Sequence, residues 1–274
     1  MRHRSRGLAG LLLAVWANLA PGTGLRMNTK MTTLGPSSRR VVLGGGVAVS
    51  YGLFAKSVLD RAKEAENASL FTEKATLAFA SAVPQDSLRV LEIGFGQKGR
   101  NLERLPPKTK LAGIDLDPPS GSDLDRVQAQ AADFGIDLSL LRGDASAIPF
   151  PDSSFDAVVG TFVLCSVTDQ MAVLREISRV LKPRGRYGFV EHVRADPGTS
   201  LLKQQQIFDP LQQRLAHNCH LCRETDELIA SVACGRQCPT GGDQALFSTL
   251  DKLERFQVPE MWPISQQSWG VVTR

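Results

Sequence analysis

From residue 57 onward, short apolar runs alternate with longer stretches in which apolar residues recur every three or four positions. The short runs predict β-strands and the longer amphipathic stretches predict helices. The predicted strands are 89–93, 110–115, 138–142, 157–161 and 186–193. The predicted helices are 57–82, 101–105, 124–134 and 168–181, with further helices between 200 and 232. We expect Thr168 or Asp169 to cap the helix 168–181, and Pro183 and Gly185 to end it. Strands that alternate with helices indicate an α/β fold with a parallel sheet covered on both faces.

The first 59 residues and the rest of the chain carry net charges of opposite sign. Residues 1–59 contain eight Lys or Arg and no acidic residue, so the net charge of +4 of the 274-residue chain comes from this leader. The remainder carries a net charge of −4, which argues against a duplex nucleic acid as a partner held through its phosphates. We therefore divide the chain into a targeting leader with a membrane-associated segment, 1–59, and one globular domain, 60–274.

The leader contains three stretches typical of targeting signals. Residues 8–20 form a short apolar run after a basic start, which is typical of a secretory signal peptide and also of a short membrane anchor. Residues 25–38 are basic, rich in hydroxyl groups and free of acid, as transit peptides are. The pair Arg39-Arg40 precedes an apolar run, 41–55, and resembles a twin-arginine export signal.

Taken in series, these stretches predict an exported or organellar protein, with the plastid and finally the thylakoid as its destination. The alternative is that 41–55 is an interfacial helix that holds the protein peripherally at an endomembrane. Its 15 residues include three consecutive glycines, which suit a spanning helix poorly. Both interpretations stay open at this point.

The loop after the first predicted strand, VLEIGFGQKGRN, can be interpreted in two ways. Gly94, Gly96 and Gly99 spell G-x-G-x-x-G, the dinucleotide fingerprint, which is weak when it stands alone. Glu92, Gly94 and Gly96 alternatively spell the E-x-G-x-G start of a methyl-donor loop whose last glycine is displaced. A glycine-rich loop between a strand and a helix suits any ligand that must approach the backbone closely.

Carboxylates near this loop favour the methyl donor over a dinucleotide. Asp115 ends the second strand and can accept both ribose hydroxyls of either cofactor. Glu92 would repel an anionic diphosphate but would favour the cationic sulfonium and ammonium of S-adenosylmethionine. Asp144 and Ala145 follow the third strand, where a carboxylate and a backbone amide can receive the adenine.

Four segments between Leu88 and Val193 resemble the class I S-adenosylmethionine-dependent methyltransferases, in particular the methyltransferase type 11 domain. They are VLEIGFG, GIDLDP, GDASAIPFPDSSFDAVV and REISRVLKPRGR. More narrowly, FDAVVGTFVLCSV and the EHV that precedes Gln204–Pro210 resemble the methyltransferase-like thiol S-methyltransferases of animal endomembranes and their plant and algal relatives. The resemblance implies a Rossmann-like, doubly wound seven-stranded sheet, mostly parallel with an antiparallel last strand. It also implies S-adenosylmethionine as the cofactor and a small-molecule acceptor, such as a thiol.

The resemblance also implies roles for individual residues. The methionine end of the donor is assigned to Glu92, Gly94 and Gly96, the ribose to Asp115, the adenine to Asp144 and Ala145, and closure of the site near the methionine moiety to Thr161. His192, next to Glu191, is the candidate catalytic residue that positions or deprotonates the acceptor, although a structural histidine at a strand end is an equal alternative.

The glycine loop departs from the family pattern by one residue. Gln97-Lys98 replace a single spacer, which moves the third glycine to Gly99 and creates the apparent dinucleotide fingerprint. This insertion leaves two alternatives beside catalysis with S-adenosylmethionine. One is a domain that binds the donor without catalysis, and the other, which Glu92 disfavours, is an NAD-dependent oxidoreductase.

The cysteines are few and mostly near the C-terminus. Four of them form a C-x2-C-x11-C-x3-C pattern with two histidines interleaved, and they are Cys219, Cys222, Cys234 and Cys238. The pattern fits a zinc site, and it equally fits one or two disulfides in an oxidising compartment. The resemblance aligns only Cys219 with a recurring cysteine, so we expect unpaired or disulfide-linked cysteines and no metal. Cys165, in an apolar run, is expected to be a core residue.

Overall fold

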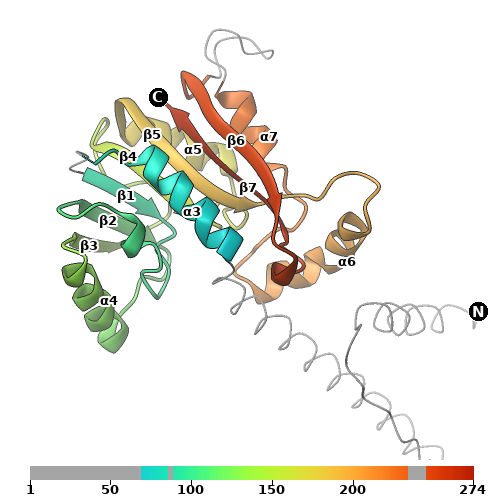
Figure 1. The fold of residues 1–274 in the computed structure, drawn as a ribbon, viewed down its shortest axis with the longest axis horizontal. Coiled ribbons are helices and arrows are strands. Elements are labelled where there is room, and N and C mark those ends of the chain that lie inside the picture. The colour runs from blue at the N-terminus through green and yellow to red at the C-terminus, as the bar shows by residue number, and fades with distance from the viewer. Residues whose placement is uncertain (1–68, 86–88, 234–244) are drawn as a thin grey trace, which may run out of the picture. The chain divides into compact units, whose positions relative to one another are not determined.

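The computed structural model describes residues 69–85, 89–233 and 245–274, and Figure 1 shows their arrangement. The predicted leader and the first part of the predicted helix 57–82 lie outside the described residues. The strands are β1 (Arg89–Ile93), β2 (Lys110–Asp115), β3 (Asp137–Arg142), β4 (Phe155–Thr161), β5 (Leu181–His192), β6 (Thr249–Gln257) and β7 (Gln266–Thr273). The helices are α3 (Ser69–Ala82), α4 (Gly121–Asp133), α5 (Gln170–Val180), α6 (Ser200–Leu215) and α7 (Thr225–Val232), with 3-10 turns η1 (Leu102–Arg104) and η4 (Pro259–Met261).

The strands form one seven-stranded sheet in the order β3-β2-β1-β4-β5-β7-β6. The first five strands pair in parallel, and β7 pairs antiparallel with both β5 and β6. This confirms the predicted Rossmann-like, doubly wound sheet with an antiparallel last strand. The strand order reverses between β1 and β4, and in such sheets ligands bind beyond the carboxyl ends of the strands at this switch point.

Helices cover both faces of the sheet, as the alternation of strands and helices predicts. One apolar layer joins α3 and α4 to the sheet, and the opposite layer joins α5 and α7 to it. Figure 1 shows α3 in front of the strands and α5 behind them. Helix α3 approaches β5 closely because Gly188 lacks a side chain, and a Cβ there would lie 2.6 Å from the Cβ of Ala82.

The predicted and observed boundaries differ at two elements near the site. The predicted helix 101–105 is only the single 3-10 turn η1. Strand β5 begins at Leu181 rather than at Arg186, because Leu181 is fully buried and pairs with Phe155 at a bulge in the ladder. Helix α5 has the predicted cap, since the Asp169 carboxylate accepts a hydrogen bond from the Ala172 amide at 3.0 Å.

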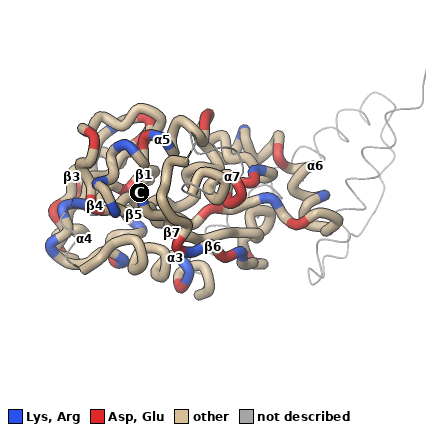
Figure 2. The backbone as a smooth tube through the Cα atoms, turned by 90° about the horizontal axis from the view of Figure 1, so that it is seen from above, with Lys and Arg blue, Asp and Glu red and all other residues tan. Residues whose placement is uncertain are grey.

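Charged residues of both signs are interspersed over the described part of the chain, as Figure 2 shows. Several are paired at short range, for example Arg179 with Glu176 at 2.7 Å and Lys182 with Asp156 at 2.6 Å. None of the described helices combines the length and apolarity that crossing a bilayer requires.

Candidate active site

Glu92 lies in the sheet at the switch point, one residue before the end of β1. The side chain is 1% exposed, and its Oε1 accepts a hydrogen bond from the Asn101 amide at 2.7 Å. Its Oε2 is buried and has no partner among the described residues. Burial raises the pKa of Glu92 to about 8, and the charge of Asp115 adds to this rise, whereas the Asn101 hydrogen bond and the Arg104 charge lower it. Glu92 is therefore a buried carboxyl group with one oxygen that receives no hydrogen bond from the described residues.

Asn101 connects the ends of β1 and β4, and the sequence did not point to it. Its side-chain amide donates to Glu92 and also lies 3.3 Å from the hydroxyl of Thr161, which ends β4. In the parallel register Glu92 is opposite Val159, so Glu92 and Thr161 share one face of the sheet. The structure thus brings two predicted site residues together through a third. A polar residue that follows a glycine loop and precedes a helical turn was the available signal.

The three glycines of the first loop have different surroundings, although all three have positive φ. A Cβ on Gly94 would lie 2.3 Å from a methyl group of Val163, and a Cβ on Gly99 would lie 2.8 Å from Leu102. A Cβ on Gly96 would meet no atom within 4 Å, so this backbone faces open space. Gly94 and Gly99 therefore permit close packing of the chain, whereas Gly96 is exposed toward a space that a ligand can fill.

Asp115 ends β2 beside this loop. Its Oδ2 accepts the Gly96 amide at 2.8 Å and its Oδ1 accepts the Asp117 amide at 2.8 Å. Each carboxylate oxygen has a second lone pair, so two hydroxyl donors can still bind. The next residue, Leu116, is 69% exposed, which is unusual for a large apolar side chain and was not singled out from the sequence.

Asp144 and Ala145 follow the end of β3 on the same edge of the sheet. Asp144 is exposed, and its Oδ1 accepts the Ser146 amide at 2.8 Å. Ala145 is 9% exposed and belongs to the apolar layer under the sheet. The carboxyl ends of β1, β2, β3 and β4 thus carry every residue that was predicted to hold a donor.

Glu191, the neighbour of the predicted His192, organises the turn after β4. Its carboxylate accepts the amides of Val163 and Leu164 at 2.9 Å and that of Cys165 at 3.3 Å. The side chain is fully buried, and burial raises its pKa to about 7 while the backbone hydrogen bonds lower it. Phe162, at the start of this turn, has a φ of 56°, which is uncommon for a non-glycine residue. A buried carboxylate therefore holds a turn at the active-site edge.

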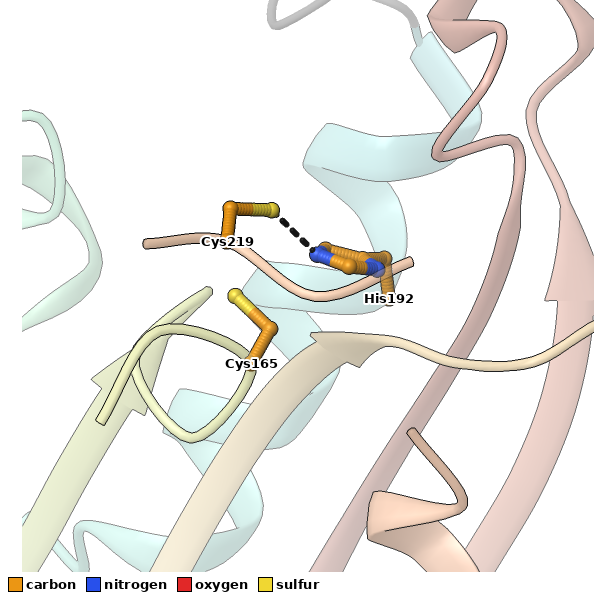
Figure 3. Close-up of side chains that lie close together, drawn as sticks. All are labelled: Cys165, His192 and Cys219. Carbon is orange, nitrogen blue, oxygen red and sulfur yellow. Dashed lines mark hydrogen bonds between the residues drawn. The ribbon is translucent and has the colours of Figure 1, made fainter. Parts of the chain in front are cut away.

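His192 is buried in a cluster with two cysteines, as Figure 3 shows. Its Nε2 lies 2.8 Å from Sγ of Cys219, and the ligand atoms of Cys165, His192 and Cys219 all lie within 4.8 Å of one another. Nδ1 of His192 is buried without a partner among the described residues. The imidazole also packs against the ring of Phe162, with centroids 6.0 Å apart.

The cluster is electrostatically polarised. The hydrogen bond from Cys165, supported by the charge of His192, lowers the pKa of Cys219 to about 4, although burial opposes this. The pKa of Cys165 is raised well above its usual value by the same hydrogen bond and by burial. Burial alone would lower the pKa of His192, but the charge of Cys219, the hydrogen bond to Cys219 and the charge of Glu191 together outweigh burial and raise the pKa. The shifts of Cys219 and His192 support each other, because the charge of each group favours the charged form of the other.

The structure describes two of the four C-terminal cysteines, Cys219 and Cys222, and they do not belong to one cluster of ligand atoms. Cys219 is in the cluster, whereas Cys222 is a half-buried free cysteine outside it. Cys234 and Cys238 lie outside the described residues, so the predicted disulfides are not tested. Cys165 is fully buried as expected, but it contacts Cys219 rather than only apolar neighbours.

Two residues of α6, Gln204 and Phe208, contact Trp262, whereas a third, Gln205, contacts other parts of the chain. The Oε1 of Gln204 accepts the indole N–H of Trp262 at 2.6 Å, and Phe208 meets the same indole edge-on at 5.2 Å between centroids. Gln205 is fully buried, and it accepts the Ala195 amide while its own amide group faces two backbone carbonyls. Gln205 thus joins α6 to the sheet as a structural residue.

The sequence matches a family described as "Methyltransferase domain" over residues 91–189. Human "Thiol S-methyltransferase TMT1A" is 33% identical over 183 residues, which are 67% of this chain and 69% of the human protein. Rat "Thiol S-methyltransferase TMT1B" is 34% identical over 140 residues, which are 51% of this chain and 57% of the rat protein. The chain therefore spans just over two thirds of one relative and less than two thirds of the other.

Solved structures share the fold at low sequence identity. A putative methyltransferase from Bacillus halodurans has a TM-score of 0.53 at 16% identity, and the match covers 74% of this chain and 98% of that one. The [4+2]-cyclase SpnF has a TM-score of 0.50 at 18% identity, covering 73% of this chain and 80% of that one. A cyclase and a methyltransferase on one scaffold illustrate that the site, and not the fold, determines the reaction.

Proposed function

The chain belongs to the class I S-adenosylmethionine-dependent methyltransferases, and from this premise we propose that it methylates the sulfur of a small-molecule thiol. The relatives named as thiol S-methyltransferases support the choice of acceptor. The observation that carries the proposal is the buried Glu92 carboxylate, whose Oε2 has no partner among the described residues beside a glycine loop with open space at Gly96.

These features fit S-adenosylmethionine better than a dinucleotide. An unpaired buried carboxylate is costly, and a cationic ligand removes that cost whereas a diphosphate increases it. A Cβ-sized space at Gly96 lets a ligand approach the backbone. We assign the ammonium end of the donor to Glu92 and the loop, the ribose hydroxyls to Asp115, and the adenine to Asp144 and Ala145.

The chain's residues need to position the reactants rather than activate them. S-adenosylmethionine, when bound, supplies an electrophilic methyl group, which passes from the sulfonium to the thiol sulfur and leaves S-adenosylhomocysteine, a methyl thioether and one released proton. Holding both sulfurs in line can contribute about 7–11 kcal/mol toward the barrier. Strand β4 lies between β1 and β5 in the sheet, so Thr161 and Phe162, at and just after the end of β4, lie between the donor loop and His192, where the donor's methyl group and the acceptor sulfur are to meet.

The direct test is methyl transfer by the purified full-length protein from labelled S-adenosylmethionine to a panel of small thiols. Alcohols and amines of the same carbon skeletons serve as matched acceptors. We expect labelled methyl thioethers from the thiols only. Calorimetric titration with S-adenosylhomocysteine and with NADH is the companion measurement. Binding of NADH without binding of the sulfur nucleoside contradicts the assignment, and donor binding without turnover on any acceptor identifies a non-catalytic domain.

We further propose that residues 1–59 deliver the protein to a plastid, with the interfacial alternative at 41–55 as the competing outcome. The support is the acid-free composition and the Arg39-Arg40 pair of the leader. Mass spectrometry of the mature N-terminus distinguishes the two. A mature chain that begins within or after 41–55 agrees with cleavage of the leader, whereas a mature chain that keeps 41–55 intact and is recovered with membranes agrees with the anchor.

A further inference from the structure

We propose that Cys165, His192 and Cys219 form a three-ligand binding site for a Zn²⁺ ion at the acceptor end of the active site. The three ligand atoms lie within 4.8 Å of one another, and all three side chains are buried. They come from the turn after β4, the end of β5 and the turn after α6, so three separate segments converge on one point (Figure 3).

The ligand types select the metal. Two sulfurs and one imidazole are typical of zinc, and three protein ligands with a free fourth position are typical of zinc sites that bind a reactant. The nearest carboxylate along the chain, Glu191, belongs to the opposite face of β5 and is occupied by three backbone amides. Among the described residues the set is therefore Cys2His, without an oxygen ligand that would favour magnesium or calcium.

The turns that carry the two sulfurs are held in place independently of any ion. The Glu191 carboxylate holds the turn that carries Cys165, because it accepts three backbone amides of that turn. The Cys219 turn contains two consecutive residues with positive φ, of which Asn218 donates its side-chain amide to the Ser166 carbonyl at 2.9 Å. The next amide, that of His220, donates to the Cys165 carbonyl at 2.9 Å. The two sulfur-bearing turns are thus bonded to each other.

Binding of zinc requires only a small adjustment of this geometry. Tetrahedral bonds of zinc to sulfur and nitrogen place the two ligand atoms about 3.5 Å apart, whereas Nε2 of His192 and Sγ of Cys219 are 2.8 Å apart here. A side-chain rotation must separate these two atoms by about 0.7 Å. Ligand atoms that are as far apart as the 4.8 Å limit must approach each other by about 1 Å. The Gln212 amide, 3.6 Å from Sγ of Cys219, is the outer-shell donor that a zinc-bound thiolate commonly has.

The fourth position is assigned to the sulfur of the acceptor, and this part rests on the proposed function. A thiol that binds zinc loses its proton and becomes a thiolate, which is the nucleophilic form. The cluster is suitably placed, because Cys165 follows Thr161 by four residues and His192 contacts Phe162. The site departs from the sequence expectation of no metal, and it includes only one cysteine of the C-x2-C pair.

The test begins with the zinc content of the full-length protein, purified without chelators and measured by elemental mass spectrometry. We expect one zinc per chain in the natural protein and in the matched control Cys222→Ser. Cys165→Ser, Cys219→Ser and His192→Gln should each weaken zinc binding roughly 100-fold or more, since loss of even an outer-shell partner costs about 10–100-fold. Binding of S-adenosylhomocysteine by each variant confirms that it is folded.

Cobalt substitution makes the test independent of whether the variants fold. Co²⁺ in the natural protein should give thiolate-to-metal charge-transfer bands and the visible bands of a tetrahedral site, and a small thiol should shift the visible bands. Absence of zinc and of cobalt bands, or a Cys165–Cys219 disulfide in protein that takes up no zinc after reduction, overturns the site. A zinc-loaded protein whose cobalt spectrum no thiol alters overturns only the fourth-position assignment. A zinc-loaded protein that methylates no thiol contradicts the proposed function and leaves the ion site standing.

Discussion

Glu92 and Glu191 are both buried near the carboxyl ends of the strands, but the protein supplies different numbers of hydrogen bonds to their carboxylates. In β5, both carboxylate oxygens of Glu191 accept hydrogen bonds from backbone amides of the turn after β4. In β1, Oε1 of Glu92 accepts a hydrogen bond from the Asn101 side chain, and Oε2 has no partner among the described residues. Strand alternation directs Glu191 toward the layer that contains α5 and Glu92 toward the layer that contains α3.

The difference separates a structural carboxylate from one that awaits a ligand. Both are acidic and both are less than 2% exposed, so residue type and burial do not distinguish them. What distinguishes them is how many hydrogen bonds the chain itself supplies. A buried acceptor that the protein leaves unsatisfied is costly, and a ligand that satisfies it gains affinity from that cost.

The largest effect is expected from removing the structural carboxylate. Glu191→Ala leaves two buried amides and one partly buried amide without their acceptor, at about 1–3 kcal/mol for each buried amide, so the free energy of unfolding should fall by roughly 3 kcal/mol or more. Chemical denaturation measures this loss. Glu92→Ala is the matched control and should cost clearly less, because it frees only the Asn101 amide. A greater loss for Glu92→Ala than for Glu191→Ala would reverse the comparison.

The second prediction concerns the carboxylate that faces the ligand. Glu92→Gln keeps the size of the side chain and removes its charge, so the affinity for S-adenosylhomocysteine should fall by about 10–100-fold, as expected for a lost charge-assisted hydrogen bond of about 1.5–3 kcal/mol. The free energy of unfolding at pH 8 should stay equal or increase, since a buried charge disappears. Calorimetry and denaturation report the two quantities. Unchanged affinity would show that Glu92 does not contact the donor.

A pH dependence follows from the raised pKa of Glu92. With a pKa of about 8, the free protein must release a proton before it offers a carboxylate to a cation. Donor affinity should therefore increase with pH, by up to about tenfold per unit, and level off above about pH 8. Glu92→Gln should remove this part of the slope. A slope that is identical in the variant would assign the dependence to a titrating group other than Glu92.

The same shift has the opposite sign for stability. The folded protein holds the Glu92 proton between about pH 4.5 and pH 8, where the unfolded chain has already released it. The contribution of this group to stability is therefore full below about pH 4.5 and is lost as the pH rises toward 8. Melting curves of the natural protein and of Glu92→Gln across this window should converge at the acidic end, since neighbouring Arg104 and Asp115 are present in both.

The two regions also differ in how far the sequence predicts them. The donor side was predictable because its residues follow successive strands, and the alternation of apolar runs already places Glu92, Asp115 and Asp144 at one edge. The positive φ at Gly94 and Gly96 agrees with the motif as well. Asn101 was missed because its role depends on a contact with β4, 60 residues later.

The cysteine side could not be predicted, because its contacts depend on the three-dimensional connection of distant turns. Cys165, His192 and Cys219 are separated by 27 residues at each step, and no spacing rule links them. The regular C-x2-C pattern drew attention to Cys222, which lies outside the cluster. Glu191 was noted only as a neighbour of His192, since nothing in the sequence indicates that three amides of another segment converge on it.

The smallest expected effect tests whether the inserted residue of the glycine loop weakens the donor side. The Gln97 side-chain amide donates to the backbone carbonyl of Asp117, and the backbone carbonyl of Gln97 accepts a hydrogen bond from Arg126 at 3.1 Å. The side chain of the extra residue thus connects the loop to the end of β2. Gly99 still fulfils a packing role against Leu102 despite its displacement. Gln97→Ala should therefore reduce the affinity for S-adenosylhomocysteine by only about 2–5-fold, as loss of one exposed hydrogen bond of about 0.5–1 kcal/mol implies.

Lys98→Ala, at the next exposed position, is the control for an effect of charge or loop composition. A gain in affinity for Gln97→Ala would mean that the insertion holds the loop away from its binding conformation, and Glu92 would then be only one of two determinants of donor binding.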